Sequence, residues 1–281
     1  MKIHAFKIHN VDMDELEALL ASIGSLPLSD RLLTISDQAI RAEHVKQSNH
    51  LSFINFTKIT KEGPGKAGFS SPISDFDLND DEGFGHETAV AIAKEKSVAI
   101  VQYNHNGPRA NIIREYLNRM AKKEIDESFF FVPILKEDER SRLDAMKSVK
   151  KLEVSVFIPG VISDDEAAKL SITKLLDSKM IGSAETLTFS ISAGRQKNNS
   201  LSKGSVMDFI NDLLSIREDV KKIRINGEDE SDAGVQVLDL LNARLEMKSD
   251  IKRRGRRYSQ DERFIKLQQA YAQWHKSGQL D

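Results

Sequence analysis

The sequence predicts an α+β protein with mixed sheets, interleaved helices and two lobes. Segments with the two-residue alternation of strands are mixed with segments of helical spacing, and they follow no regular strand–helix period. The length of 281 residues is enough for one large domain or two ordinary ones. A Pro159-Gly160 pair breaks the chain, so we expect an N-terminal α+β lobe over 1–159 and a C-terminal α+β lobe over 160–281.

The first lobe opens with a predicted strand over 1–9 and a helix. Asp12, with Glu15 three residues later, is a helix-start signal before apolar residues that recur at helical spacing from Leu16 to Ile23. Further strands are expected over 32–35, 39–45 and 51–59.

Residues 61–85 form a predicted long loop that is rich in glycine, proline and acids. Its Gly63-Pro-Gly65-Lys66 segment lacks the full frame of a phosphate-binding loop. Its acids could ligate a hard cation but lack EF-hand spacing, so we expect solvated side chains. This acidic group comprises Asp75, Asp77, Asp80, Asp81, Glu82 and Glu87, with His86 beside it.

Residues 86–93 and 97–104 form a predicted hairpin whose alternating apolar residues can face a core. Asn106-Gly107-Pro108 then indicates a turn into a helix over 109–123. Tyr103 before this turn and Arg109 after it are placed to line a pocket.

The remaining elements continue the same mixture. Strands are expected over 129–135 and 151–158 around a charged helix over 137–147. A capped helix over 163–176, a strand over 186–193 and a helix over 205–216 follow. The last elements are a strand over 220–225, an acidic turn over 228–232, an apolar stretch over 235–245 and a C-terminal helix that Ser259 and Glu262 cap.

The composition excludes several classes. With no cysteine, the chain has no disulfide framework, thiolate zinc site or cysteine nucleophile. No apolar run approaches the roughly 20 residues that span a bilayer, and the opening residues lack a signal peptide's apolar region. We therefore expect a soluble, cytoplasmic protein without a cofactor, a metal or direct membrane insertion. The formal net charge of −2 means that polyanion binding requires a local patch.

A basic run is the sharpest compositional feature. Four arginines and one lysine lie within six residues, and guanidinium groups suit phosphate oxygens, so the run predicts nucleic-acid binding without sequence selectivity. A solvated loop or a processing signal is the alternative. The run comprises Lys252, Arg253, Arg254, Arg256 and Arg257; weaker candidates are the loop residues Arg195, Lys197 and Lys203, and the strand residues Lys221, Lys222 and Arg224.

A nuclease is the enzymatic alternative. Glu246-Met247-Lys248 matches the E-x-K triplet of metal-dependent nucleases, in which acids hold Mg²⁺ and lysine helps to activate water. Asp239 is the candidate upstream acid. The triplet is short and frequent by chance, so we expect a protein that is not an enzyme.

The C-terminal helix carries an apolar stripe with two interpretations. It can bury against its own lobe, or it can form a twofold dimer seam that brings two basic runs together. We expect a homodimer, and the candidate seam residues are Phe264, Leu267, Tyr271 and Trp274.

Three blocks carry a resemblance: GPGKAGFSSP, DDEGFGHETAVAI and IVQYNHNGPRANIIREYL. They resemble an uncharacterised bacterial family. The order of elements is more remotely similar to the RexA phage-exclusion proteins and the DNA-binding B components of Kiwa anti-phage systems. The resemblance implies a homodimer that binds double-stranded DNA in anti-phage defence or phage exclusion, beside a membrane-protein partner encoded nearby. A sensor that binds a phage or host protein is a third alternative, in which the basic run grips an acidic protein surface.

Overall fold

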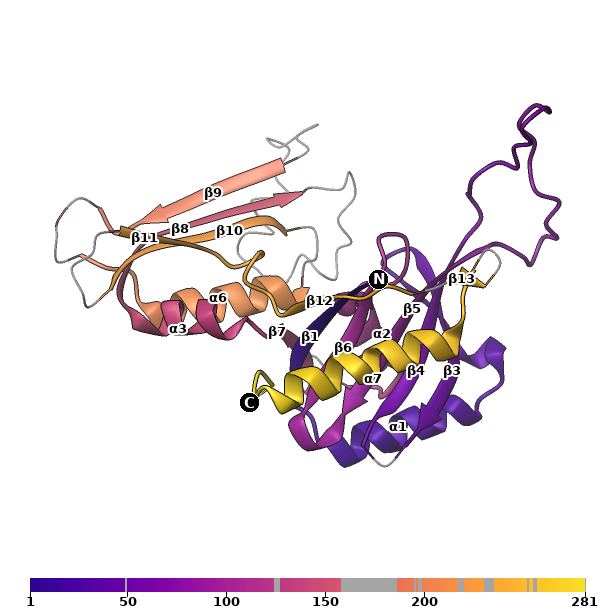
Figure 1. Cartoon of the computed structure of the whole chain (residues 1–281), viewed down its shortest axis with the longest axis horizontal. Coiled ribbons are helices and arrows are strands. Elements are labelled where there is room, and N and C mark those ends of the chain that lie inside the picture. The colour runs from indigo at the N-terminus through magenta and orange to yellow at the C-terminus, as the bar shows by residue number, and fades with distance from the viewer. Residues whose placement is uncertain are drawn as a thin grey trace.

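The computed structural model describes residues 1–48, 50–123, 127–157, 186–194, 196, 199–216, 220–229, 235–251, 253–254 and 257–280. Two antiparallel sheets with helices packed on them lie side by side (Figure 1). The predicted α+β class is therefore confirmed. No helix within the described ranges combines the length and the apolar character that a bilayer span requires.

The larger sheet is built around β1. Its strands lie in the order β12-β1-β6-β5-β4-β3-β2, and β7 also pairs with β1, beyond the stretch that β12 occupies. The strands are β1 (Lys2–His9), β2 (Leu32–Ile35), β3 (Gln38–Gln47), β4 (Ser52–Thr60), β5 (Phe84–Ala93), β6 (Val98–Tyr103), β7 (Phe130–Pro133) and β12 (Glu246–Lys248). The predicted hairpin over 86–104 is β5 and β6, joined by the short turn η2 (Lys94–Lys96).

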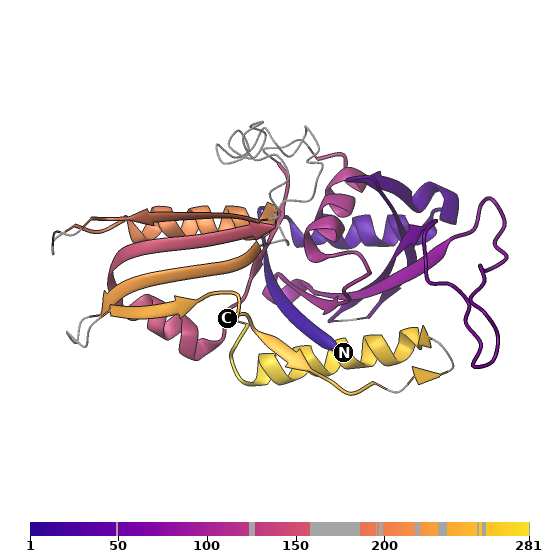
Figure 2. The same ribbon diagram turned by 90° about the horizontal axis from the view of Figure 1, so that it is seen from above.

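Helices cover both faces of the larger sheet (Figure 2). On one face, α1 (Met13–Ser25) and α2 (Ala110–Met120) bury a core to which Val90 and Ile92 of β5 contribute. On the other face, α7 (Gln260–Lys276) covers Ala89 and Ala91 of the same strand. Because successive side chains point to opposite faces, β5 supplies large residues to one core and small alanines beneath α7.

The smaller sheet has the strand order β11-β10-β8-β9. The apolar side chains of α3 and α6 pack on one of its faces, where they form a third core. Its elements are α3 (Glu137–Ala145), β8 (Met146–Phe157), β9 (Thr186–Ser192), α6 (Lys203–Ile216), β10 (Val220–Asp229) and β11 (Val235–Asp239). The predicted helix over 163–176 lies outside the described residues, as does most of the predicted acidic turn over 228–232.

The two sheets do not follow the predicted lobe boundary at residue 159. The chain enters the smaller sheet near residue 137 and returns to the larger one near residue 245. Two antiparallel segments make this crossing: Leu245 N–H donates to Ile134 O at 2.7 Å, and Lys136 N–H donates to Ala243 O at 2.8 Å. The C-terminal helix thus belongs to the sheet that the first residues of the chain build.

The stripe on α7 is buried inside the chain, which corrects its interpretation as a dimer seam. Ser259 caps the helix as predicted, because its side chain accepts a hydrogen bond from Glu262 N–H at 3.2 Å. The four stripe residues face β5 and β6 and have little accessible surface: Phe264 (5%), Leu267 (0%), Tyr271 (9%) and Trp274 (3%). Sequence spacing alone could not distinguish the chain's own sheet from a second copy.

We expect Trp274→Ala to lower the free energy of unfolding by about 3–5 kcal/mol, since it opens a cavity beneath α7. Urea denaturation followed by circular dichroism measures this change. Ile265→Ala on the exposed side of the same helix is the matched control, with an expected change within about 0.5 kcal/mol. A Trp274 variant of unchanged stability that dissociates a dimer would restore the seam interpretation.

Candidate functional site

The described part of the basic run pairs as a short hairpin immediately before α7. The strands β13 (Arg253–Arg254) and β14 (Arg257–Tyr258) pair in antiparallel register, with Arg254 opposite Arg257. Lys252 and Arg256 of the predicted set lie outside the described residues. The Arg257 side chain is 77% exposed. The hairpin therefore lies at the surface, near the base of the arm formed by residues 61–83 (Figure 1).

Glu87 of β5 anchors this hairpin to the larger sheet. Its carboxylate accepts hydrogen bonds from Arg257 Nε at 3.1 Å and from Arg263 Nη2 at 2.8 Å. Asn55 Nδ2 donates a third, at 3.0 Å. Burial alone would raise the pKa of Glu87, but the hydrogen bonds from Arg257 and Arg263 outweigh it and hold that pKa below its ordinary value. The predicted assignment of Glu87 to a group of solvated loop acids is therefore wrong.

The weaker basic candidates make contacts within the fold. Lys203 Nζ donates to the backbone oxygens of Asp144 at 2.9 Å and Met146 at 3.4 Å, where α3 ends. Lys222 and Arg224 share one face of β10, as alternation predicts, and they pair with acids of neighbouring strands, Glu153 and Asp239. The predicted loop residues Arg195 and Lys197 lie outside the described residues. Lys221 lies on β10, but its side chain is outside the described part of the structure.

The structure does not assemble the nuclease triad. Asp239 ends β11 in the smaller sheet, where its carboxylate accepts from Leu241 N–H at 3.2 Å. Glu246 lies on β12 in the larger sheet, 3.3 Å from Lys2 Nζ and 4.0 Å from Lys248 Nζ. Within the described part of the chain, no three His, Asp or Glu side chains gather as ligands for a metal ion.

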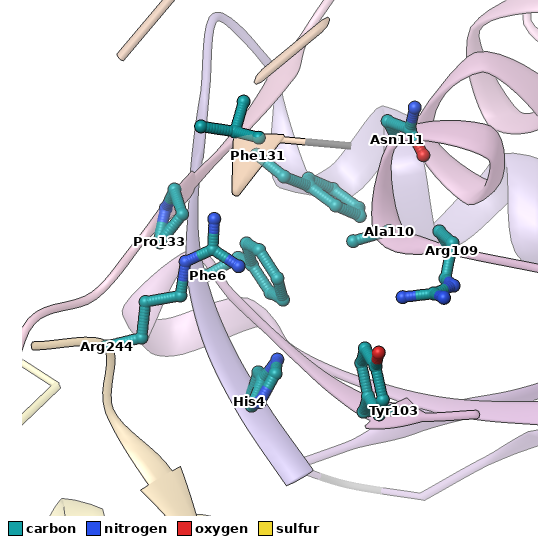
Figure 3. A pocket seen from close by; sticks show the side chains of 10 residues that line it. His4, Phe6, Tyr103, Arg109, Ala110, Asn111, Phe131, Pro133 and Arg244 are labelled. Atoms are coloured by element: carbon teal, nitrogen blue, oxygen red, sulfur yellow. The ribbon is translucent and has the colours of Figure 1, made fainter. Parts of the chain in front are cut away.

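A pocket of about 190 Å³ lies at the edge of the larger sheet, beside the first residue of β10. The side chains that line it come from six parts of the fold (Figure 3). They are His4 and Phe6 of β1, Tyr103 of β6, Arg109, Ala110 and Asn111 at the start of α2, Phe131 and Pro133 of β7, Val220 of β10, and Arg244 before β12.

The two arginines reach into the pocket from opposite sides (Figure 3). The Arg109 guanidinium lies 4.5 Å from the centre of the Tyr103 ring, and its Nη2 donates to His105 O at 3.2 Å. These contacts fix the Arg109 side chain over the aromatic ring. Among the described residues that line the pocket there is no carboxylate.

His4 contributes a neutral ring to this pocket. Burial lowers the pKa of His4, and although the hydrogen bond to Glu246 raises it, the pKa stays below the ordinary value of 6.5. The ring is therefore uncharged at pH 7. His4 Nε2 lies 3.2 Å from a Glu246 carboxylate oxygen, so in the neutral ring the proton belongs on Nε2, which leaves Nδ1 as an acceptor.

The turn before α2 positions Arg109. Asn104 Nδ2 donates to Glu87 O at 2.7 Å, which holds the turn against β5. A Cβ at Gly107 would lie 2.5 Å from Thr88 Oγ1, so only glycine permits this close approach. The structure confirms that Tyr103 and Arg109 line a pocket, as the sequence predicted.

Sequence reasoning missed His4 and Arg244. His4 reaches the pocket because β1 pairs with β6, which places Lys2 opposite Tyr103 and His4 opposite Val101. The sequence did contain a signal for His4: it lies two and four residues before Phe6 and Ile8, and residues two apart share a face of a strand. Arg244 had no such signal, because it joins the pocket only through the return of the chain to β12.

The fold and sites define an α+β protein that displays a basic hairpin and a pocket to which two arginines contribute. Residues 9–277 match a family of unknown function, DUF6731, and the chain belongs to that family. No curated protein matches the sequence.

We expect Glu87→Ala to lower the free energy of unfolding by about 3–5 kcal/mol, because it leaves the Arg263 charge buried without its carboxylate. Denaturation in urea measures this loss, and Glu139→Ala, which removes a partly exposed ion pair with Arg142, should cost less than about 1 kcal/mol.

The same pair predicts the direction of a pH effect. The folded-state pKa of Glu87 is lowered, so its contribution is complete above the ordinary carboxyl pKa and is lost as the pH falls through the lowered value. The stability difference between wild type and Glu87→Ala should shrink over that acidic range. A difference that is constant with pH would contradict the assigned ion pair.

Proposed function

We propose that the protein binds double-stranded DNA through the phosphate backbone, without sequence preference, and acts in bacterial anti-phage defence or phage exclusion. The observation that carries this proposal is the basic run, which concentrates five positive charges within six residues of a chain whose net charge is −2. Guanidinium groups form paired hydrogen bonds with phosphate oxygens, and phosphate contacts carry no sequence information. The resemblance to phage-exclusion and Kiwa proteins supplies the biological setting.

The anchor to Glu87 supports the hairpin as a binding element. Arg257 stays 77% exposed although its guanidinium is bonded to Glu87, so the bond fixes the strand without covering the side chain. A fixed hairpin loses less conformational freedom on binding than a flexible tail would.

We expect the affinity for duplex DNA to fall with salt, with a log–log slope of roughly −0.9 for each phosphate that is neutralised. Titration of a labelled duplex at several salt concentrations measures the slope. Replacing Arg253, Arg254 and Arg256 by alanine should reduce its magnitude and weaken binding, while Arg257 and its bond to Glu87 are kept.

The control for this titration is the Lys222→Ala, Arg224→Ala variant, whose cations pair with Glu153 and Asp239 on the smaller sheet. It should bind DNA like the wild type. Unchanged affinity in the hairpin variant, or an affinity independent of salt, would contradict the proposal. The titration is repeated with Mg²⁺, and we expect the duplex to remain uncut.

We further propose a homodimer that works beside a membrane-protein partner encoded nearby. With the α7 stripe buried, the arm over 61–83 offers a different contact for a second copy. Phe69 at its tip is fully exposed and Ile73 is largely exposed. Apolar side chains displayed in this way are typical of protein contacts, because water around them is released on association.

We expect Phe69→Ser with Ile73→Ser to raise the dimer dissociation constant by about tenfold or more, through lost apolar burial. Light scattering over a dilution series measures the constant. Ile265→Ser, at an exposed apolar position on α7, is the control and should leave it unchanged. A wild type that is monomeric throughout, or a dimer insensitive to the arm variant, would rule out this contact.

A further inference from the structure

We propose that the tip of the arm over 61–83 inserts into an apolar pocket on a second copy of the chain, between α1 and the residues that follow α2. This contact rests on the homodimer proposed above, and it names the surface that receives the arm. The exposed apolar tip and the pocket lie at opposite ends of the larger sheet, so the tip of one chain fits the pocket of another.

The base of the arm is fastened by packing and hydrogen bonds. Lys61 Nζ donates to the backbone oxygens of Asp80 and Glu82, the latter at 3.0 Å, and so joins the two limbs. The rings of Phe76 and Phe84 pack edge to face, with their centres 5.5 Å apart. The arm therefore leaves the sheet in one direction, away from the rest of the fold (Figure 1).

The tip of the arm displays two large apolar side chains. Lys66 N–H donates to Ser74 O at 2.7 Å, and Ser74 N–H donates to Lys66 O at 2.9 Å, so these residues form a neck. Beyond the neck, Phe69 is fully exposed and Ile73 is largely exposed. A tip with a hydrogen-bonded neck loses less conformational freedom on docking than an open loop would.

The receiving pocket has a volume of about 310 Å³. Leu16 and Phe129 form its floor and belong to the first core, with exposures of 1% and 2%. Val11, Ala18 and Leu19 add apolar walls. An apolar cavity of about 150 Å³ accommodates a benzene molecule, so this larger space has room for a phenyl ring together with a branched aliphatic side chain.

The charges around the pocket match those of the arm. Glu15 and Lys123 line the pocket and form an ion pair at 3.3 Å, so their charges cancel and the pocket favours an uncharged group. Residues 65–74 contain one charge, on Lys66, and Asp75 follows on the other limb. One orientation of the tip places Lys66 beside Glu15 and Asp75 beside Lys123. Opposite charges at a rim fix the orientation of a contact more than its affinity.

The arm of one chain points away from its own pocket. It joins β5 at Phe84, whereas α1 lies at the other end of that strand, where Lys94 Nζ pairs with Glu17 at 3.1 Å. The ten residues of β5, at about 3.3 Å each, separate these ends by about 30 Å. Figure 1 shows the arm extending beyond the end of the sheet that is remote from α1.

A twofold axis across the strands brings each arm to the α1 end of the other copy. Each chain then gives one tip and receives one, so the contact is formed twice and the assembly closes as a dimer. The second insertion is intramolecular once the first has formed, which raises the overall affinity without a new kind of contact. Insertion in one direction only would instead extend into an open chain of copies.

Blocking the pocket tests the receiving surface. We expect Ala18→Trp to raise the dimer dissociation constant by about tenfold or more, because a bulky ring at the exposed rim keeps the tip out. Ala21→Trp, at an exposed position of α1 outside the pocket, is the matched control and should leave the constant unchanged. Light scattering over a dilution series measures the constant, and circular dichroism checks that both variants keep the helix content of the wild type.

Combination with the arm variant provides a second measurement. Added to Phe69→Ser with Ile73→Ser, Ala18→Trp should weaken the dimer little further, because both changes remove the same contact. Full additivity of the two effects would show that the tip and the pocket act in separate contacts.

Disulfide trapping tests the same contact directly, since the chain has no cysteine of its own. Ser70→Cys at the tip and Ser22→Cys at the pocket rim are prepared as separate chains with tags of different size, then mixed and oxidised. We expect the mixed disulfide as the main product. Ile265→Cys on α7 replaces Ser22→Cys in the control and should form little mixed product.

The outcomes separate this contact from the homodimer itself. A dimer that the arm variant weakens but Ala18→Trp does not would overturn the pocket as the receiving surface and leave the arm dimer intact. A tip-to-tip disulfide in excess of the mixed product, or assemblies that grow beyond two copies, would overturn it as well. A wild type that is monomeric throughout, or a dimer indifferent to the arm variant, would remove the proposed homodimer and the insertion together.

Discussion

Arg263 carries a full positive charge into the space between α7 and the larger sheet, where Glu87 supplies the negative charge that compensates it. The arginine side chain is only 2% exposed, so this pairing is a condition for α7 to lie on the sheet. The same carboxylate holds Arg257 of the hairpin, while the backbone oxygen of Glu87 holds Asn104 in the turn before α2. One residue of β5 therefore fixes the basic hairpin on one face of the sheet and the turn that positions Arg109 on the other.

The pocket depends on a second constraint, the pairing around β1. That strand pairs with β6 along one edge and with both β12 and β7 along the other. His4 thereby meets Glu246 from a strand that is 242 residues away in the sequence. The lining of the pocket assembles only where these distant strands, the start of α2 and the end of the crossing segment meet.

Local features of the fold were predictable from sequence because their signals are local. Each of these features depends on residues that are close together in the sequence. They are the cap at Ser259, the hairpin over 86–104 and the glycine turn at Gly107. The return of residues 245–280 to the first sheet was not predictable, since β12 is short and its partner lies at the other end of the sequence. Glu87 shows the same difficulty. It follows a run of exposed acids, and only the packing of α7 distinguishes it from them.

The crossing of the chain between the sheets has a consequence for how the protein is made. The face of β5 and β6 that α7 covers includes Ala89, Ala91 and Ile100, all buried in the finished fold. At synthesis rates of about 5–20 residues per second, that face stays uncovered for roughly 10–30 s until residues 260–276 have been synthesised. A nascent chain thus exposes an apolar sheet face throughout the production of the smaller sheet. This interval gives ribosome-associated chaperones a defined surface and a defined time in which to act.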